Sequence, residues 1–233
     1  MEEIAHIHTD FPTKFGLPRQ SGLVDGLKGT VIFAPKYRDP NALRGLSDYS
    51  HLWLIWKFSE SVREDWSPTV RPPRLGGNTQ VGVFATRSPF RPNPIGLSSV
   101  RLDSIEYDTP DGAVLHVSGI DLMDGTPIYD IKPYLPYVDS HPDATGGFSD
   151  AVRDYALRVV IPDDCLARVP AAKREALAAV LAQDPRPGYR RNDERRFGIR
   201  FAGLDVRFVV RDGVLTVVEV AGDGVSRDHE RRP

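Results

Sequence analysis

The stretch SSVRLDSIEYDTPDGAVLHVSG, residues 98–119, decides the fold class. Two runs of β-type residues flank Asp111-Gly112, a dipeptide that tolerates the positive φ of a tight hairpin turn. Short runs of the same kind recur outward from this hairpin, separated by Gly and Pro, at residues 29–34, 51–58, 81–86 and 128–132. No long helix is expected between them. The pattern predicts a mainly β N-terminal domain, either a barrel or a sandwich.

The chain is expected to divide near HPDATGGFSD, residues 141–150, which lacks hydrophobic periodicity. Beyond it, PAAKREALAAVLA (170–182) predicts a helix, because Leu177, Val180 and Leu181 fall on one face. Residues 197–220 predict strands around a second hairpin signal at Asp212-Gly213. We therefore expect a β domain over residues 1–145 and a small α+β domain over residues 150–233.

Composition predicts a folded protein, since 40% of the 233 residues are hydrophobic and 27% are charged. No window approaches the ~18 apolar residues of a membrane span, and the first ten residues lack the pattern of a signal peptide. We expect a cytoplasmic protein with no membrane partner. Cys165 is the only cysteine, which excludes an internal disulfide and a cysteine-built metal cluster.

Arginine is concentrated in two segments, although the net charge of the chain is only −2. Residues 67–101 contain five arginines and no Asp, Glu or Lys, and residues 186–211 contain eight arginines against three acids. Guanidinium groups suit bidentate contact with phosphate and stacking on bases. A solvated surface is the alternative explanation. A codon bias that favours arginine would explain the excess of 24 arginines over 6 lysines, but not the clustering without acids.

Several common motifs are absent from the sequence: GxGxxG after a strand, GxxxxGK[ST], GxSxG and HExxH. Rossmann cofactors, P-loop chemistry, lipase-type hydrolysis and zincin chemistry are therefore disfavoured. His6 and His8 would share one face of a strand, but no third ligand follows nearby in the sequence. We expect no metal site.

Three polar segments rich in proline remain: PRQ at residues 18–20, residues 69–97 and residues 121–137. Proline fixes the backbone and glycine permits conformations closed to other residues, so such segments are either structural corners or a ligand site built from loops. The paired acids, arginines and asparagines within them favour a ligand site.

These segments resemble the TsaA-like family, in particular the bacterial TrmO tRNA methyltransferases. The resemblance rests on GLPRQSGL (16–23), TVRPPRLGGNTQVGVFATRSPFRPNPIGLS (69–98), DLMDGTPIYDIKPYLPY (121–137) and DPRPGY (184–189). It implies a homodimer with an N-terminal antiparallel β-barrel and S-adenosylmethionine as cofactor. The implied reaction methylates N6 of threonylcarbamoyladenosine at position 37, in the anticodon stem-loop of threonine tRNA.

The resemblance also implies a cofactor site. Carried over by position, its residues are Arg19, Gln20, Ser59, Arg87, Leu97, Asp121, Leu122, Met123 and Asp124. The chemistry is compatible, because an arginine can bind the carboxylate of the cofactor and an aspartate can face a positive group. Ser59 varies in side-chain type within the family.

Methylation of N6 needs alignment, and a proton acceptor is plausible because the N6 lone pair is delocalised. Asp124, Asp130 and Tyr134 are the candidates for this catalytic role. For each of them, a hydrogen bond at a turn or barrel corner is the alternative.

RNA binding is expected at the arginine-rich segments, since the bases of an anticodon loop can be read without melting a duplex. The candidates are Arg71, Arg74 and Arg91 near the cofactor, and Arg186, Arg190, Arg191, Arg195 and Arg196 in the C-terminal domain. A non-catalytic RNA- or ligand-binding β-barrel module, in which the arginines serve affinity alone, is the alternative function.

Overall fold

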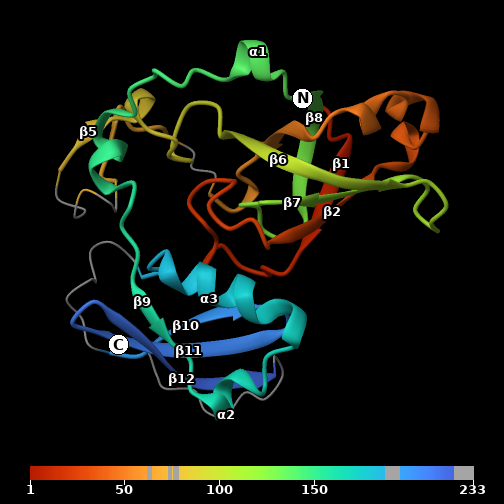
Figure 1. Cartoon of the computed structure of the whole chain (residues 1–233). Helices are drawn as coiled ribbons and strands as arrows, with labels where there is room; N and C mark the ends of the chain where they lie inside the picture. Colours follow the sequence, from red (N-terminus) through yellow and green to blue (C-terminus); the bar gives the residue numbers. More distant parts are fainter. Residues whose placement is uncertain (62–64, 73–74, 76–78, 187–194, 223–233) are drawn as a thin grey trace.

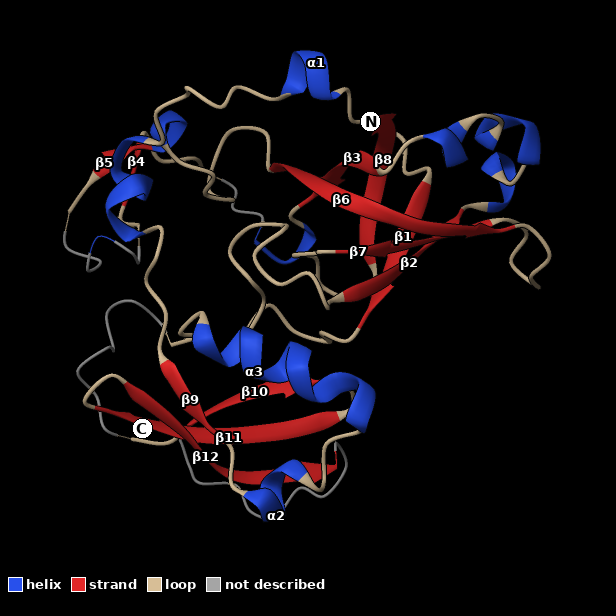
Figure 2. Ribbon diagram, in the orientation of Figure 1, coloured by secondary structure: helices blue, strands red, loops and turns tan. Residues whose placement is uncertain are grey.

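The computed structural model describes residues 1–61, 65–72, 75, 79–186 and 195–222, which form two β units (Figures 1 and 2). The first unit is a closed antiparallel barrel in the order β1–β2–β7–β6–β3–β8. Its strands are β1 (Ala5–Thr9), β2 (Lys28–Phe33), β3 (His51–Lys57), β6 (Ile95–Glu106), β7 (Val114–Ser118) and β8 (Thr126–Pro133). The predicted mainly β class with an N-terminal antiparallel barrel is confirmed.

Apolar side chains at every second position of the strands fill the barrel. In β3, Leu52, Leu54 and Trp56 are buried, and the residues between them face outward. This period of two follows from the pleat, which turns successive side chains to opposite faces. Burying one such large apolar side chain stabilises the fold by about 1.5 to 3 kcal/mol.

The prediction of a strand over residues 81–86 is wrong. Only β5 (Val81–Gly82) is extended, and it pairs with β4 (Thr69–Val70) outside the barrel. The chain then turns into η6 (Val83–Ala85), closed by the hydroxyl of Thr86, which donates to the Val83 carbonyl oxygen at 2.8 Å. The sixth barrel strand is instead β1, at the N-terminus.

Both hairpin signals are confirmed, with different turns. Asp212 and Gly213 alone join β11 (Leu204–Arg211) to β12 (Val214–Gly222), and both have positive φ, as a tight primed turn requires. Between β6 and β7 the connection is longer. Gly112 has the expected positive φ, and Thr109 closes the turn by donating its hydroxyl to the Gly112 carbonyl oxygen at 2.6 Å.

The second unit is a four-stranded sheet covered by a helix. The sheet order is β10 (Phe197–Phe201), β11 (Leu204–Arg211), β12 (Val214–Gly222) and β9 (Arg158–Val160), with β9 parallel to β12. The predicted helix forms as η8 (Ala171–Lys173) followed by α3 (Arg174–Ala182), and its predicted apolar face is buried. Strand β9 and helix α2 (Asp163–Leu166) were not expected.

Short elements complete the described chain. They are η1 (Pro35–Tyr37), η2 (Pro40–Leu43), η3 (Leu46–Asp48), η4 (Ser59–Ser61), α1 (Pro136–Asp139) and η7 (Gly147–Val152). Among all the residues that the structure describes, no helix is long and apolar enough to cross a bilayer.

The two units pack together through the segment that follows β1. The ring of Phe11 lies 5.2 Å from that of Phe201, and the backbone N–H of Ala202 donates to the Asp10 carbonyl oxygen at 2.8 Å. Lys173 forms an ion pair with the Asp10 carboxylate. One continuous hydrophobic core therefore includes residues of the barrel and of the C-terminal sheet.

Gly96 of β6 lies against the indole ring of buried Trp56, and a Cβ at this position would come within 2.2 Å of the ring. We expect Gly96→Ala to lower the free energy of unfolding by about 1 to 3 kcal/mol, because the barrel interior is closely packed. Gly82→Ala is the matched control, since a Cβ there would meet nothing within 4 Å. Urea unfolding measures both, and equal stability of the two variants would contradict the packing argument.

Candidate functional site

Three segments that are distant in sequence meet at one end of the barrel. Gln20 comes from the loop after β1, Arg87 from the turn after η6 and Asp121 from the connection between β7 and β8. The Arg87 guanidinium donates to the side-chain oxygen of Gln20, and its positive charge acts on the Asp121 carboxyl group. The structure thus brings together three residues of the predicted cofactor set.

A chain of hydrogen bonds runs from the barrel interior to this site. The indole N–H of Trp56 donates to the Ser98 hydroxyl oxygen at 2.9 Å, and the Ser98 hydroxyl donates to Asp121 Oδ1 at 2.6 Å. Trp56 and Ser98 are buried. Because each group is held by the next, the orientation of the Asp121 carboxyl group is set by the packed core.

The environment of Asp121 disfavours its charge. Burial raises the pKa of this carboxyl group to about 6, against hydrogen bonds from Ser98 and the Ser21 backbone and the charge of Arg87, which lower it. Removing a carboxylate from water without a full counter-charge costs free energy, so the ionised form is poorly stabilised. A positively charged ligand group placed beside Asp121 would supply that stabilisation.

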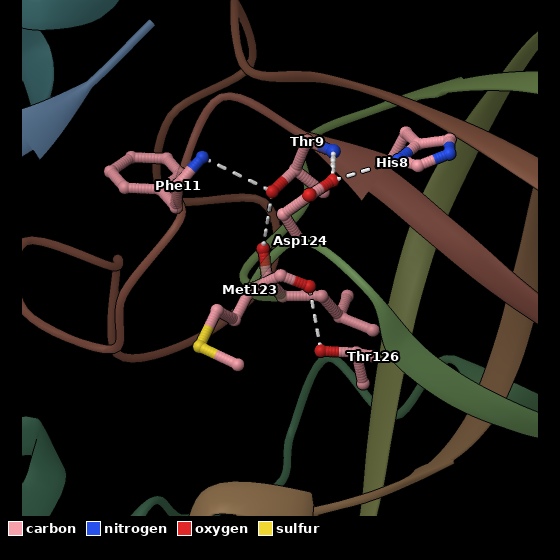
Figure 3. Close-up of polar contacts among 7 residues, drawn as sticks. His8, Thr9, Phe11, Met123, Asp124 and Thr126 are labelled. Carbon is pink, nitrogen blue, oxygen red and sulfur yellow. Dashed lines mark hydrogen bonds and ion pairs between the residues drawn. The ribbon is translucent and has the colours of Figure 1, made fainter. Parts of the chain in front are cut away.

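The connection that carries Asp121 is fixed to the end of β1 (Figure 3). Asp124 Oδ1 accepts from the Thr9 backbone N–H at 2.9 Å and contacts His8 Nδ1 at 3.0 Å. The Thr9 hydroxyl donates to the Leu122 carbonyl oxygen at 3.1 Å. The position of this connection is therefore determined by residues more than one hundred positions earlier in the chain.

The other predicted cofactor residues are more scattered. Arg19 lines a pocket of about 230 Å³ together with Asp184 and Arg186, at the junction with the C-terminal unit. The Leu122 side chain lies in the barrel core, so its backbone alone can meet a ligand. Leu97 is 51% exposed and lies on the outer face of β6. Ser59 begins the exposed turn η4, and Met123 is half-buried beside Asp124.

The three predicted catalytic residues are not brought together within one chain. Asp124 precedes the eight-residue strand β8 and Tyr134 follows it, so about 25 Å of strand separates them. The Tyr134 ring packs 5.5 Å from that of Trp53. Asp130 lies on the outer face, where Lys132 Nζ contacts its carboxylate at 2.8 Å. The three candidates for the proton-acceptor role therefore lie at different places in the chain.

The arginines expected to bind RNA also separate into groups. Arg71, Arg195 and Arg196 are exposed, whereas Arg74, Arg190 and Arg191 lie outside the described residues. Arg91 donates to the Thr86 carbonyl oxygen at 3.0 Å.

Arg186 contradicts the expectation of an exposed guanidinium, because it is 5% exposed. Its Nε lies 2.8 Å from Asp184 Oδ1, and this ion pair holds the side chain inside the C-terminal unit. Asp184 follows α3 by two residues, adopts a positive φ and is itself fully buried.

Sequence reasoning missed Ser98, Trp56, His8 and Thr9 as contributors to the site. Ser98 had a detectable signal, because it is a polar residue at an inward position of β6, in phase with Gly96 and Val100. Such a residue must find a buried hydrogen-bond partner. Among the described residues, no group of three or more His, Cys, Asp or Glu is arranged to hold a metal ion.

The fold and the site define a class. The N-terminal unit is a small closed β-barrel with a loop-built polar site at one end, outside the Rossmann class of nucleotide-binding folds.

Comparison with known proteins identifies the family. Residues 6–140 match the model of the tRNA-methyltransferase O N-terminal domain, and residues 154–223 match that of the TrmO C-terminal domain. This chain belongs to the TrmO family, which confirms the resemblance inferred from its motifs.

Relatives and solved structures agree with this assignment. The chain is 39% identical over 219 residues to the tRNA (adenine(37)-N6)-methyltransferase of Escherichia coli, covering 91% of this chain and 93% of the relative. It is 42% identical over 229 residues to a Pseudomonas aeruginosa protein, RcsF, which is named as an S-adenosylmethionine-dependent methyltransferase. The match covers 94% of this chain and 96% of the relative. A crystal structure of TrmO from P. aeruginosa superimposes with a TM-score of 0.75 at 37% identity, covering 94% of this chain and 95% of that one.

The raised pKa of Asp121 predicts a pH dependence of stability. Between its ordinary value of 3.8 and about 6, the folded state holds a proton that the unfolded state releases. The stability of the wild type relative to Asp121→Asn should therefore fall as pH rises from about 4 to about 7, by on the order of 1 to 3 kcal/mol. Melting curves across this range measure it.

Asp139→Asn provides a contrast of opposite sign. Hydrogen bonds from the Leu135 backbone and from Trp53 lower the pKa of Asp139, so the wild type should gain stability over that variant as pH rises through the acid range. A pH-independent difference between the wild type and Asp121→Asn would contradict the assignment for Asp121.

Proposed function

We propose that this protein uses S-adenosylmethionine to methylate N6 of adenosine 37 in tRNA, and that the natural substrate is threonylcarbamoyladenosine in the anticodon loop of threonine tRNA. Membership of the TrmO family over both units supports the reaction class. The observation that carries the proposal is the meeting of Gln20, Arg87 and Asp121, from three separate motif segments, at one end of the barrel.

The residues present fit S-adenosylmethionine. The methionine part of the cofactor carries a carboxylate, an ammonium group and a sulfonium, so a site needs both an anion-binding and a cation-binding group. Arg87 and Gln20 offer donors to the carboxylate, and the partly desolvated Asp121 carboxyl group favours a cation beside it. When bound, the cofactor supplies an electrophilic methyl group.

The remaining residues of the connection position the site. Thr9 and His8 hold Asp124, and Thr9 also holds the Leu122 carbonyl oxygen, so the backbone of residues 121–124 can present hydrogen-bonding groups in a fixed geometry. Such preorganisation is the main requirement of methyl transfer, in which orientation supplies several kcal/mol of the barrier reduction. We place Arg19, Ser59, Leu97 and Met123 at the edge of this site.

For the proton of N6, we propose Asp124 as the acceptor. It is the one candidate of the three that belongs to the connection carrying Asp121. We assign structural roles to Asp130 and Tyr134, because Asp130 forms an ion pair with Lys132 on the outer face and Tyr134 packs on Trp53 within the chain. This assignment replaces the role expected for them from the sequence.

For RNA contact, we propose Arg71 and Arg91 near the cofactor end, and Arg195 and Arg196 on the C-terminal unit. Arg71, Arg195 and Arg196 are exposed, and a guanidinium on the surface can neutralise phosphate. We further propose that the protein is a homodimer and acts in the cytoplasm, where tRNA is modified.

Methylation should require the threonylcarbamoyl group. Threonine tRNA that carries threonylcarbamoyladenosine at position 37 should gain a labelled methyl group from S-adenosylmethionine, and the unmodified transcript should gain little or none. Mass analysis of the digested nucleosides measures both. Equal turnover of the two substrates would contradict this specificity. Cofactor binding without any methylation would instead favour a non-catalytic binding module.

The C-terminal arginines should contribute to tRNA affinity through phosphate contacts. We expect Arg195→Gln with Arg196→Gln to weaken tRNA binding and to reduce the slope of log K against log salt by about 1 to 2, because each lost phosphate contact reduces that slope by about 0.7 to 0.9. Binding at several salt concentrations measures the slope. Arg101→Gln, on the barrel, is the control. An unchanged slope in a well-folded double variant would place the RNA-binding surface elsewhere.

A further inference from the structure

Two large aromatic side chains are exposed beside each other outside the barrel. Trp66 is 52% exposed and Phe84 is 72% exposed. Their rings are stacked, with centroids 6.2 Å apart and planes 26° apart. Neither ring is needed to fill the hydrophobic core, so the pair presents apolar, planar surface to a partner.

The pair is held by a built substructure. Strands β4 and β5 pair directly after Trp66, and the Val83 backbone N–H donates to the Pro68 carbonyl oxygen at 2.9 Å. The side chain of Val83 is buried, whereas that of the next residue, Phe84, points outward. The turn η6 therefore fixes Phe84 on the surface instead of leaving it on a loose segment.

The chain on either side of Phe84 carries arginines: residues 67–101 contain five arginines and no acid, whereas Asp65 directly precedes Trp66. Arg71 is exposed next to β4, and the guanidinium of Arg91 is anchored on the Thr86 carbonyl oxygen at 3.0 Å. Aromatic faces together with arginines are the combination by which proteins bind unpaired nucleotides, since every base offers a flat face for stacking.

The pair also lies close to the proposed cofactor site. Only Ala85 and Thr86 separate Phe84 from Arg87, so the Cα atoms of Phe84 and Arg87 are at most about 11 Å apart. A base stacked on Phe84 would therefore belong to the same loop of RNA as the base that is methylated.

We propose that Trp66 and Phe84 form a stacking platform for an unpaired nucleobase of the RNA substrate. The platform rests on the proposed function, because it would hold a base of the anticodon loop next to the target adenosine. A second copy of this chain is the less favoured occupant, since two such surfaces face to face would bring acid-free, arginine-rich segments together.

Binding of the modified anticodon stem-loop to the full-length protein tests the platform. Phe84→Ala and Trp66→Ala should each weaken RNA binding by about 5- to 150-fold, as loss of one stacked base does, whereas the ring-retaining Phe84→Tyr should stay near wild type. Cofactor affinity, measured by calorimetry, should be unchanged in all three. Tyr107→Ala is the matched control, because Tyr107 is also 52% exposed but lies between β6 and β7, at the opposite end of β7 from the connection that carries Asp121.

Fluorescence gives a direct readout of stacking. Trp53 and Trp56 are less exposed than Trp66, so the RNA should quench the Trp66 emission. The Trp66→Phe variant should lose most of this quenching while retaining RNA binding within a few-fold of wild type. Quenching that persists in Trp66→Phe would overturn the platform.

Further outcomes separate the platform from the proposed function. If the wild type methylates tRNA but folded Phe84→Ala and Trp66→Ala bind RNA normally, the platform is wrong and the function stands. If light scattering shows that Phe84→Ala changes the oligomeric mass, a second copy occupies the pair and the platform is wrong. If the wild type binds cofactor but neither binds nor methylates tRNA, the proposed function fails and the platform fails with it.

Discussion

Strand β1 is hydrogen-bonded along both edges, to β2 and to β8, and the rest of the structure depends on this double pairing. It closes the barrel, so that the barrel has no open strand edge. The strand ends at Thr9, which holds the connection that carries Asp121 and Asp124. The next residues, Asp10 and Phe11, contact the C-terminal unit. One short strand thus places the site relative to both units.

The hydrogen-bond chain from Trp56 through Ser98 to Asp121 shows how the core determines the chemistry of the site. A packed tryptophan orients a serine, and the serine orients a carboxyl group that burial has made reluctant to ionise. An ionised carboxylate in this environment lowers the stability of the fold at neutral pH. Such a group is retained where it binds a positively charged group of a ligand. The same residues therefore explain both a local loss of stability and a capacity to bind a cation.

Local sequence rules were accurate where neighbouring residues decide the conformation. Asp212-Gly213 forms the predicted tight turn, and Leu177, Val180 and Leu181 form the buried face of α3. The rules were wrong at residues 81–86, where β-type residues form a turn, because β1 supplies the sixth barrel strand and Val83 is anchored to Pro68. They were also wrong for Arg186, whose guanidinium is buried on Asp184.

The sequence by itself determined the mainly β class, the motif segments and the family, because these depend on residue types and on spacing along the chain. Through the resemblance of their motifs, it also predicted that Gln20, Arg87 and Asp121 belong to one cofactor site. Only the tertiary structure decided which predicted residues meet. Thr9 and Asp124 are 115 positions apart, and their contact arises from barrel closure. Asp124 and Tyr134 are close in sequence but separated by the length of β8, because an extended strand carries its two ends apart.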